Sequence, residues 1–296
     1  MKIDLHTHST RSDGTMSPTQ LLHHAIINGV DVLGLTDHDT IAGWEEATKA
    51  LRGKLQLVLG AEISCLTPEG KSVHILALLF DGAYQPLQDA LSTSRDDRIP
   101  RMKKIVELMA LDGISITFNE VLTHKPEGAT LGRPHLADAL VAKGIVKSRD
   151  EAFAKYLNNS SKYYVSHISP TPEEAVKLIK NAGGVSVMAH PYSSLVSSSE
   201  ASEPGENNSK TNLFLEYFRV LKAAGLNGVE VDHRDHNLEV RRLLRATADE
   251  LDLVTTGSSD FHGSGKLNQI GENVTAPEHW VRLEALANAR RVLTSN

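Results

Sequence analysis

The segment Ile3-Asp4-Leu5-His6-Thr7-His8 combines a short apolar strand with two histidines at the point where that strand ends. Alternate residues of an extended chain point to the same side, so His6 and His8 can bind one metal ion together. Asp13 follows in the next loop and adds a carboxylate. This stretch therefore predicts a metal site at the end of a β-strand.

Short runs rich in Val, Ile and Leu recur along the chain, separated by segments with helical periodicity. The expected strands are Ile3–His6, Val32–Thr36, Leu57–Glu62, Val73–Leu79, Val185–Ala189, Gly228–Val231 and Leu253–Thr256. Their apolar character is typical of a parallel sheet buried on both faces, and the alternation predicts an α/β layered or barrel fold. Ser17 and Thr171 each open a capping box followed by proline, which predicts a helix start at both positions.

Most of the expected strands end near a histidine or a carboxylate. The candidate metal ligands are His6, His8, Asp13, His38, Glu62, His74, His190, Asp260 and His262. The ends of parallel barrel strands meet at one mouth, where active sites lie. His74 instead begins a strand, but a turn over 67–71 predicts that this strand runs back antiparallel and returns His74 to Glu62. Imidazole and carboxylate ligands suit zinc, iron or manganese.

The strand–helix alternation stops over residues 87–165. This stretch is mostly helical, with segments at Arg98–Leu111, Arg133–Lys143 and Arg149–Leu157. We therefore expect an inserted helical domain over 87–165 and a barrel formed by 1–86 and 166–296. Residues 197–212, rich in Ser, Glu, Asn and Gly, are expected to form a mobile surface loop, a candidate lid.

The composition is that of an ordinary globular chain, with 40% hydrophobic and 23% charged residues. No apolar run is long enough for a membrane span, and the first residues lack an apolar signal segment, so we expect a cytoplasmic protein without a membrane partner. The single cysteine, Cys65, excludes an internal disulfide. A net charge of −6 argues against a general binder of duplex DNA.

Five separated motifs resemble, in order, those of the polymerase and histidinol phosphatase (PHP) superfamily. They are His6-Thr7-His8-Ser9 with Asp13-Gly14, Thr36-Asp37-His38-Asp39, Gly60-Ala61-Glu62, His190-Pro191 and Gly257-Ser258-Ser259-Asp260-Phe261-His262. The resemblance implies a distorted seven-stranded (β/α) barrel that holds two or three divalent metal ions, with magnesium as a candidate besides manganese, iron and zinc.

The same resemblance divides the ligands among three metals. It implies that His6, His8, Glu62 and Asp260 hold the first, that Asp13, His38 and His262 hold the second, and that Glu62, His74 and His190 hold the third. Glu62 would then bridge two metals.

Gly132-Arg133-Pro134-His135 is similar to the insert of a branch that contains bacterial phosphoesterases of nucleoside 3′,5′-bisphosphates and RNA 5′ ends. This implies phosphate monoester hydrolysis by a metal-bound hydroxide, giving a nucleoside monophosphate such as AMP, with short oligoribonucleotides as further substrates. Asp260 is expected to take part in catalysis, and His135 is expected to contact the phosphate or donate a proton. Arg133 can bind phosphate bidentately, and Arg234 is expected to contact the anion at a position where the chain departs from the family pattern.

Other charged residues receive no site role from the sequence. Arg95, Arg98 and Arg101 lie three apart, which favours a solvated helix face. The seven remaining histidines are interpreted as ordinary residues; they are His23, His24, His124, His167, His233, His236 and His279.

Three alternative functions compete with nucleotide phosphoester hydrolysis. A metal-dependent amidohydrolase also begins with His-X-His, but it typically lacks the late Asp260-X-His262 pair and carries a bridging lysine, for which no matching strand end has a candidate. A non-catalytic metal-binding module usually loses ligands. A histidinol-phosphatase-like hydrolase of a non-nucleotide phosphate ester would use the same ligands but is not expected to carry the Gly132–His135 motif.

Overall fold

A computed structural model describes residues 1–191 and 207–295 of the chain. The strands are β1 (Ile3–Thr7), β2 (Val32–Leu35), β3 (Gln56–Leu66), β4 (Ser72–Leu78), β5 (Val185–Ala189), β6 (Gly228–Asp232), β7 (Val254–Gly257) and β8 (Leu293–Thr294). The α-helices are α1 (Pro18–Ile27), α2 (Trp44–Ala50), α3 (Gln85–Leu111), α4 (Phe118–Thr123), α5 (Arg133–Ala142), α6 (Arg149–Ala152), α7 (Pro172–Asn181), α9 (Asn207–Ala224), α10 (Leu238–Glu250) and α11 (Pro277–Ala285). A π-helical turn over Phe153–Leu157 continues α6.

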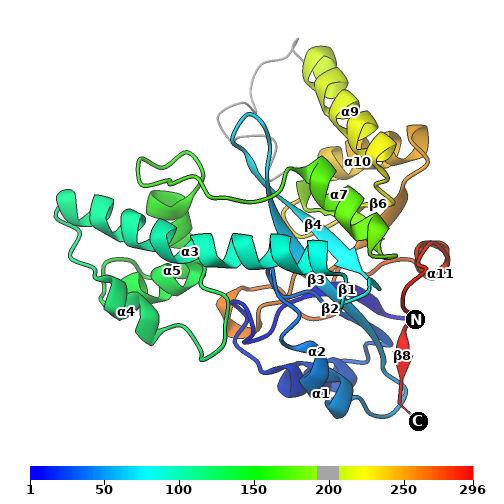
Figure 1. The fold of residues 1–296 in the computed structure, drawn as a ribbon, viewed down its shortest axis with the longest axis horizontal. Helices are drawn as coiled ribbons and strands as arrows, with labels where there is room; N and C mark the ends of the chain where they lie inside the picture. Colours follow the sequence, from blue (N-terminus) through cyan, green and yellow to red (C-terminus); the bar gives the residue numbers. More distant parts are fainter. Residues whose placement is uncertain (192–206, 296) are drawn as a thin grey trace.

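One sheet organises the molecule, and in it β1 to β7 are neighbours in chain order. Neighbouring strands are parallel, except that β4 pairs antiparallel with both β3 and β5. A parallel bridge between Thr7 on β1 and Phe261, just beyond β7, brings the two edges together. The predicted distorted seven-stranded barrel and the antiparallel return of β4 are therefore confirmed (Figure 1).

β8 was not predicted. It pairs antiparallel with β3 near the C-terminus. A strand of two residues carries no hydrophobic periodicity, so only the tertiary contact reveals it.

The helices agree with the sequence at their capping boxes, but α3 begins earlier than predicted. Ser17 and Thr171 cap α1 and α7 as predicted. α3 begins at Gln85 rather than Arg98 and continues through Pro100, although proline removes a helical hydrogen bond. Leu87 and Leu91, in its first turns, are buried in the apolar core of the barrel, and this packing favours the longer helix.

The predicted loop over 197–212 is partly wrong. Residues 207–212 lie in α9. Phe214 and Phe218, later in this helix, are buried and anchor it, and a polar segment can extend a helix that is anchored in this way. Residues 197–206 lie outside the described residues.

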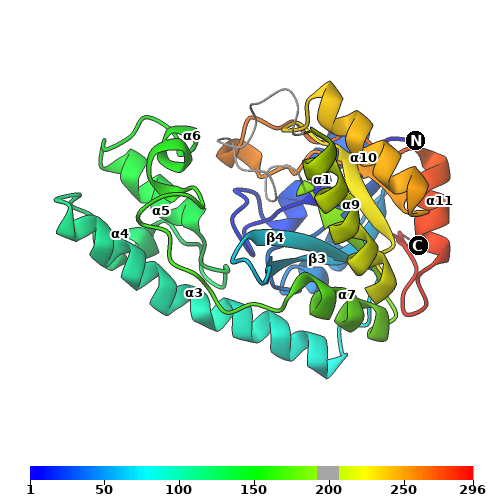
Figure 2. The same cartoon turned by 90° about the horizontal axis from the view of Figure 1, so that it is seen from above.

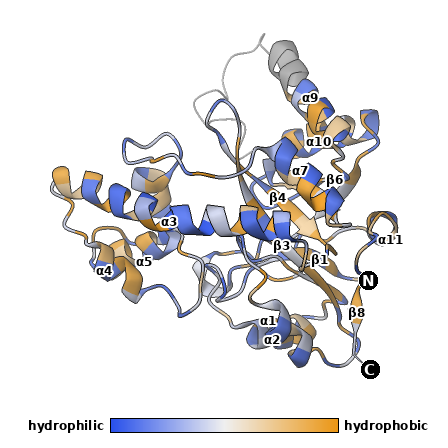
Figure 3. Ribbon diagram, in the orientation of Figure 1, coloured by the Kyte–Doolittle hydropathy of each residue, from blue (hydrophilic) through white to orange (hydrophobic). Residues whose placement is uncertain are grey.

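Three separate apolar clusters are present, of which two lie in the barrel and one lies in the helical segment beside it. The buried side chains of α5 form a cluster with Met102, Ile105 and Met109 of α3, and Figure 2 places these helices to one side of the strands. Figure 3 shows the hydrophobic colouring concentrated on the strands, with hydrophilic residues spread along α3. Since α3 contributes both to one barrel cluster and to the cluster of the helical segment, the predicted domain boundary at residue 87 stays a prediction.

Among the described helices, none combines the length and the hydropathy that a bilayer-spanning segment needs.

Candidate metal centre

Side chains with metal-binding atoms gather at the mouth of the barrel. They are the predicted set of His6, His8, Asp13, His38, Glu62, His74, His190, Asp260 and His262. His38, His74 and His190 are partly exposed, and the others are buried. Because β4 is antiparallel to its neighbours, its first residues lie beside the ends of the other strands, which is how His74 reaches the group.

The first group of donor atoms comes from β1, β3 and the loop after β7. The Nε2 atoms of His6 and His8 lie 3.0 Å apart, and each lies 3.2 Å from Oε2 of Glu62. They lie 3.5 and 3.4 Å from Oδ1 of Asp260. Ligand atoms about 2.1 Å from a tetrahedral ion stand about 3.4 Å from one another, so this spacing fits a metal ion.

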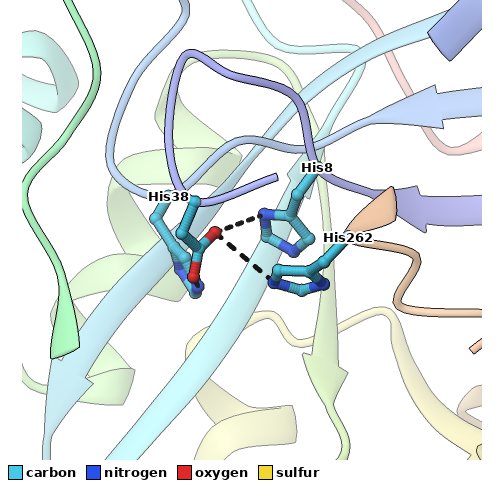
Figure 4. A group of neighbouring side chains, drawn as sticks. His8, His38 and His262 are labelled. Atoms are coloured by element: carbon cyan, nitrogen blue, oxygen red, sulfur yellow. Dashed lines mark ion pairs between the residues drawn. The ribbon is translucent and has the colours of Figure 1, made fainter. Parts of the chain in front are cut away.

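The second group centres on Asp13. Its Oδ1 atom lies 3.4 Å from Nε2 of His262 and 3.7 Å from Nδ1 of His8, and its Oδ2 atom lies 3.8 Å from Nε2 of His38. Figure 4 shows His8, His38 and His262 around a carboxylate, with dashed lines marking the ion pairs to two of them.

Glu62 connects the first group to a third one. Its Oε1 atom lies 2.8 Å from Nδ1 of His74 and 3.0 Å from Nε2 of His190. Its Oε2 atom faces His6 and His8, and it also lies 3.1 Å from Nδ1 of His38. The two oxygens of one carboxylate therefore face different sets of histidines.

Three of these atoms are buried and make no hydrogen bond of acceptable geometry within residues 1–191 and 207–295, although carboxylate or imidazole atoms lie close to them. They are Oδ1 of Asp13, Nδ1 of His38 and Nδ1 of His74. Buried polar atoms are nearly always satisfied, so three unsatisfied ones at a single mouth need a partner. Cations fit this requirement, because all three are lone-pair donors of the kind that binds transition metals.

The electrostatics of the mouth keep the carboxylates ionised. Burial alone would raise the pKa of Glu62, but His38, His74 and His6 outweigh burial and hold this pKa well below its usual value. Burial is likewise outweighed at Asp13 by His262 and His38, and at Asp260 by Lys266 and His262, so both pKa values are also well below normal. Ionised carboxylates are the form that binds a cation.

The backbone is unusual where the strands end. Asp39, His190 and Asp260 have positive φ angles of 53°, 27° and 50°. Residues other than glycine seldom adopt this region, and they are held there only by their surroundings.

Nδ1 of His262 lies 2.8 Å from the carbonyl oxygen of Asp260, and donation from this nitrogen leaves Nε2 free to face Asp13.

A buried carboxylate behind the cluster orients two of the histidines. Oε1 of Glu230 on β6 lies 3.2 Å from Nδ1 of His6, and Oε2 accepts a hydrogen bond from the backbone of His190. The Ser258 hydroxyl also donates to Glu230. Glu230 was not predicted, and its one signal is a charged residue inside the apolar run Gly228–Val231.

The cluster opens into a cavity of about 500 Å³ between the barrel mouth and the helical segment. Arg133 and Arg234, both predicted to bind substrate, line this cavity. His135 does not belong to the lining: it is buried, and its Nδ1 accepts a hydrogen bond from the backbone of Gly132. Its predicted contact with phosphate stays a prediction.

The interpretation of the three arginines on α3 as a solvated face is wrong. Arg98 forms an ion pair of 2.5 Å with the buried Asp39, Arg95 donates to the backbone oxygen of Asp39, and Arg101 lines the cavity. This helix face points toward Asp39 because α3 runs from the barrel core to the helical segment, and a sequence spacing of three cannot reveal which face that is.

Three further side chains at the mouth were not predicted. Nζ of Lys266 lies 2.5 Å from Oδ2 of Asp260, and the buried His233 has its Nε2 3.6 Å from the same oxygen. Arg149 lines the cavity and binds Asp138 through two hydrogen bonds of 2.6 Å.

Comparison with known proteins places these features in context. A family model described as the PHP domain matches residues 4–165. A 5′-3′ exoribonuclease of Haemophilus influenzae is 32% identical to the chain, over 92% of this chain and 94% of the relative. A 3′,5′-nucleoside bisphosphate phosphatase of Chromobacterium violaceum is also 32% identical, over 89% and 88%.

Two solved structures are similar along almost their whole length. A protein of Bifidobacterium adolescentis, classed among metal-dependent phosphoesterases, is 38% identical with a TM-score of 0.82 and covers 96% of both chains. A protein of Chromobacterium violaceum, described as an amidohydrolase with bound sulfate and no metal, is 30% identical with a TM-score of 0.85, over 99% of this chain and 98% of that one.

Proposed function

The chain belongs to the PHP domain family, and from this premise we propose that it is a metal-dependent phosphoesterase that acts on phosphate monoesters of nucleotides. The observation that carries the proposal is a cluster of six histidines and three carboxylates that opens into a cavity lined by six arginine and lysine side chains. The cluster provides ligands for cations, and the cavity wall attracts phosphate. Metal-assisted hydrolysis of a phosphate ester needs both.

Three metal positions are proposed from the donor groups. The first would be held by His6, His8, Glu62 and Asp260, the second by Asp13, His38 and His262, and the third by Glu62, His74 and His190. Imidazole and carboxylate ligands favour manganese, iron or zinc, and magnesium is a further candidate. When bound, such ions supply a nucleophile from water, relieve charge on the phosphoryl oxygens and stabilise the leaving group.

The side chains around the metals have separate tasks. Asp260 presents Oδ1 to the first group, while Lys266 holds Oδ2 and so fixes the orientation of the carboxylate. Arg133 and Arg234 are proposed to bind phosphate oxygens from the cavity wall. His135 lies behind this wall and holds the backbone of Gly132, so we propose that it positions the neighbouring Arg133.

Nucleoside 3′,5′-bisphosphates are the leading substrates, with phosphate and a nucleoside monophosphate such as AMP as products. Support comes from the bisphosphate phosphatase relative, which aligns with most of the chain. Short oligoribonucleotides are the second candidate, supported by the exoribonuclease relative.

The test is phosphate release by the metal-loaded protein from adenosine 3′,5′-bisphosphate, from the two adenosine monophosphates and from 5′-phosphorylated oligoribonucleotides. The Asp260→Ala variant controls for contaminating phosphatases. Release from the bisphosphate that disappears in this variant is expected. Absence of hydrolysis of every phosphate ester would contradict the proposal.

An amide substrate panel belongs to the same experiment, since one solved neighbour is described as an amidohydrolase. We expect no amide hydrolysis, because no lysine lies at a strand end where it could bridge the metals: Lys266 follows β7 by several residues and is paired with Asp260. Amide hydrolysis without phosphate release would favour the alternative.

A further inference from the structure

Six arginine and lysine side chains line the cavity, and four of them already face a carboxylate. The pairs are Arg98–Asp39 at 2.5 Å, Arg149–Asp138 at 2.6 Å, Arg234–Glu272 at 3.6 Å and Lys266–Asp260 at 2.5 Å. Arg101 and Arg133 are the two for which no carboxylate of the described residues lies within 4.0 Å. Neither guanidinium group therefore forms an ion pair with a carboxylate of the described residues.

Both guanidinium groups are held in place by neutral partners. Nε of Arg101 donates to the backbone oxygen of Val165 at 2.8 Å. Nη1 of Arg133 donates to the backbone oxygen of Leu157 at 2.7 Å and to the side-chain oxygen of Asn159 at 2.8 Å. These contacts fix the orientation of the two groups without neutralising them.

The two arginines are also close enough to repel each other. Burial, together with the charge of Arg98, lowers the pKa of Arg101 to about 10. Burial, together with the charge of Arg101, lowers the pKa of Arg133 to about 9. Both side chains still carry a full charge at neutral pH, so the protein keeps two like charges together at a cost.

Polar atoms of Arg101 and of two nearby side chains lack a hydrogen-bond partner among the described residues. Nη2 of Arg101, Nδ1 of His167 and the hydroxyl of Tyr164 are buried and have no hydrogen-bond partner in the part of the chain that the structure describes. His167 lines the cavity and is only 9% exposed. Burial and the charge of Arg101 lower its pKa to about 3, so it is a neutral imidazole that can donate one hydrogen bond.

We propose that Arg101, Arg133 and His167 form a binding site for a dianionic phosphoryl group, namely the phosphate of the substrate that is not hydrolysed at the metal centre. A dianion would compensate both guanidinium charges and accept hydrogen bonds from the unsatisfied donors. A neutral nucleobase would leave both charges uncompensated. The inference rests on the proposed function, and it makes this wall of the cavity the part that selects substrates with two phosphates.

The test separates binding from turnover. Adenosine 5′-monophosphate and adenosine are titrated by calorimetry into the metal-loaded protein and its Arg101→Gln variant. Loss of a charged hydrogen bond should raise the Kd for the monophosphate about 10- to 100-fold, whereas the Kd for adenosine should not change. The kcat/KM for adenosine 3′,5′-bisphosphate should fall by a similar factor, mainly through KM, with no such fall for adenosine 3′-monophosphate.

Two further variants keep the test decisive. Lys104→Gln removes a charge from an exposed position of α3, where Lys104 pairs with Glu107. This control variant should bind the monophosphate normally. His167→Phe keeps an aromatic ring at this position, removes its hydrogen bond and leaves the contact between Arg101 and Val165 intact. It should weaken monophosphate binding about tenfold, so it replaces Arg101→Gln if that variant does not fold.

The outcomes distinguish this inference from the proposed function. Unchanged monophosphate binding in both variants, or equal weakening of monophosphate and adenosine, would overturn the subsite. Binding of the monophosphate that depends on Arg101, in a protein that hydrolyses no nucleotide, would support the subsite and contradict the proposed function. Metal content, measured on every variant, should stay at the wild-type level.

Discussion

The Glu230 carboxylate on β6 lies 3.2 Å from Nδ1 of His6 on β1, and this contact directs Nε2 of His6 toward Glu62 and Asp260. A ligand histidine generally uses its second ring nitrogen to bind a carboxylate or carbonyl, which fixes the ring and its tautomer. Burial would raise the pKa of Glu230, but His6, His233 and His190 outweigh it and lower this pKa to about 2. Glu230 is therefore ionised and accepts the hydrogen bond from His6.

Replacement of Glu230 by glutamine should weaken metal binding without removing a ligand. Loss of such a partner typically costs about 10- to 100-fold in metal affinity. The measurement is a competition titration with a chromogenic chelator. Glu239→Gln, at an exposed position on α10, is the matched control and should bind metal normally. Wild-type affinity in Glu230→Gln would mean that Glu230 has no role in orienting His6.

The two oxygens of Glu62 give a prediction about metal stoichiometry. His74→Ala should lose the metal that we assign to Glu62, His74 and His190 and keep the other two, because His74 lies beside Oε1 of Glu62, the oxygen that also faces His190. Glu62→Gln should weaken two positions, since Oε2 also faces the first group. Elemental analysis after dialysis distinguishes the two variants, with the exposed His23→Ala as control. Equal metal content in both would contradict a bridging role.

The clustering of the proposed metal ligands could be foreseen because these residues end strands that the sequence marks clearly. Each strand is a compact apolar run, and a histidine or carboxylate directly after such a run has a defined place at the barrel mouth. His74 needed one more step, the turn before β4, and the antiparallel register placed it opposite Ser64, two residues from Glu62.

Apart from Arg133 and Arg234, the charged residues of the cavity wall could not be foreseen in the same way. Arg98 binds Asp39, which lies 59 residues earlier, and nothing in the local spacing of arginines indicates a partner so distant. Lys266 and His233 come from loops whose path depends on the packed barrel. Glu230 lies within a strand, where a single acidic residue does not reveal whether it faces the core or the solvent.

The ion pair between Arg98 and Asp39 joins α3 to the barrel, and its loss should destabilise the fold. Asp39 is fully buried, and it also accepts hydrogen bonds from the backbone and hydroxyl of Ser64. Removing one partner of a buried pair leaves an uncompensated charge, so Arg98→Gln should lower the free energy of unfolding by about 3 kcal/mol.

Urea unfolding measures this loss. The double variant Arg98→Gln/Asp39→Asn should recover part of the stability, because the neutral amide removes the unpaired charge and asparagine tolerates the positive φ of Asp39. Lys104→Gln on the same helix serves as the reference for an exposed pair. If Arg98→Gln unfolds at the same urea concentration as the wild type, the pair does not contribute to stability.

Removal of the metals should lower the melting temperature. Ions that bind only the folded protein stabilise it by mass action, by about 4 kcal/mol when the free ion is about a thousandfold above its Kd. A chelator removes this contribution and leaves three buried, ionised carboxylates close together, those of Asp13, Glu62 and Asp260. We expect a decrease on the order of 5–10 °C that is reversed when metal is added back. Asp260→Ala, which removes a proposed ligand, should melt at a temperature that responds much less to the chelator. Identical melting of the wild type with and without chelator would contradict metal binding at the barrel mouth.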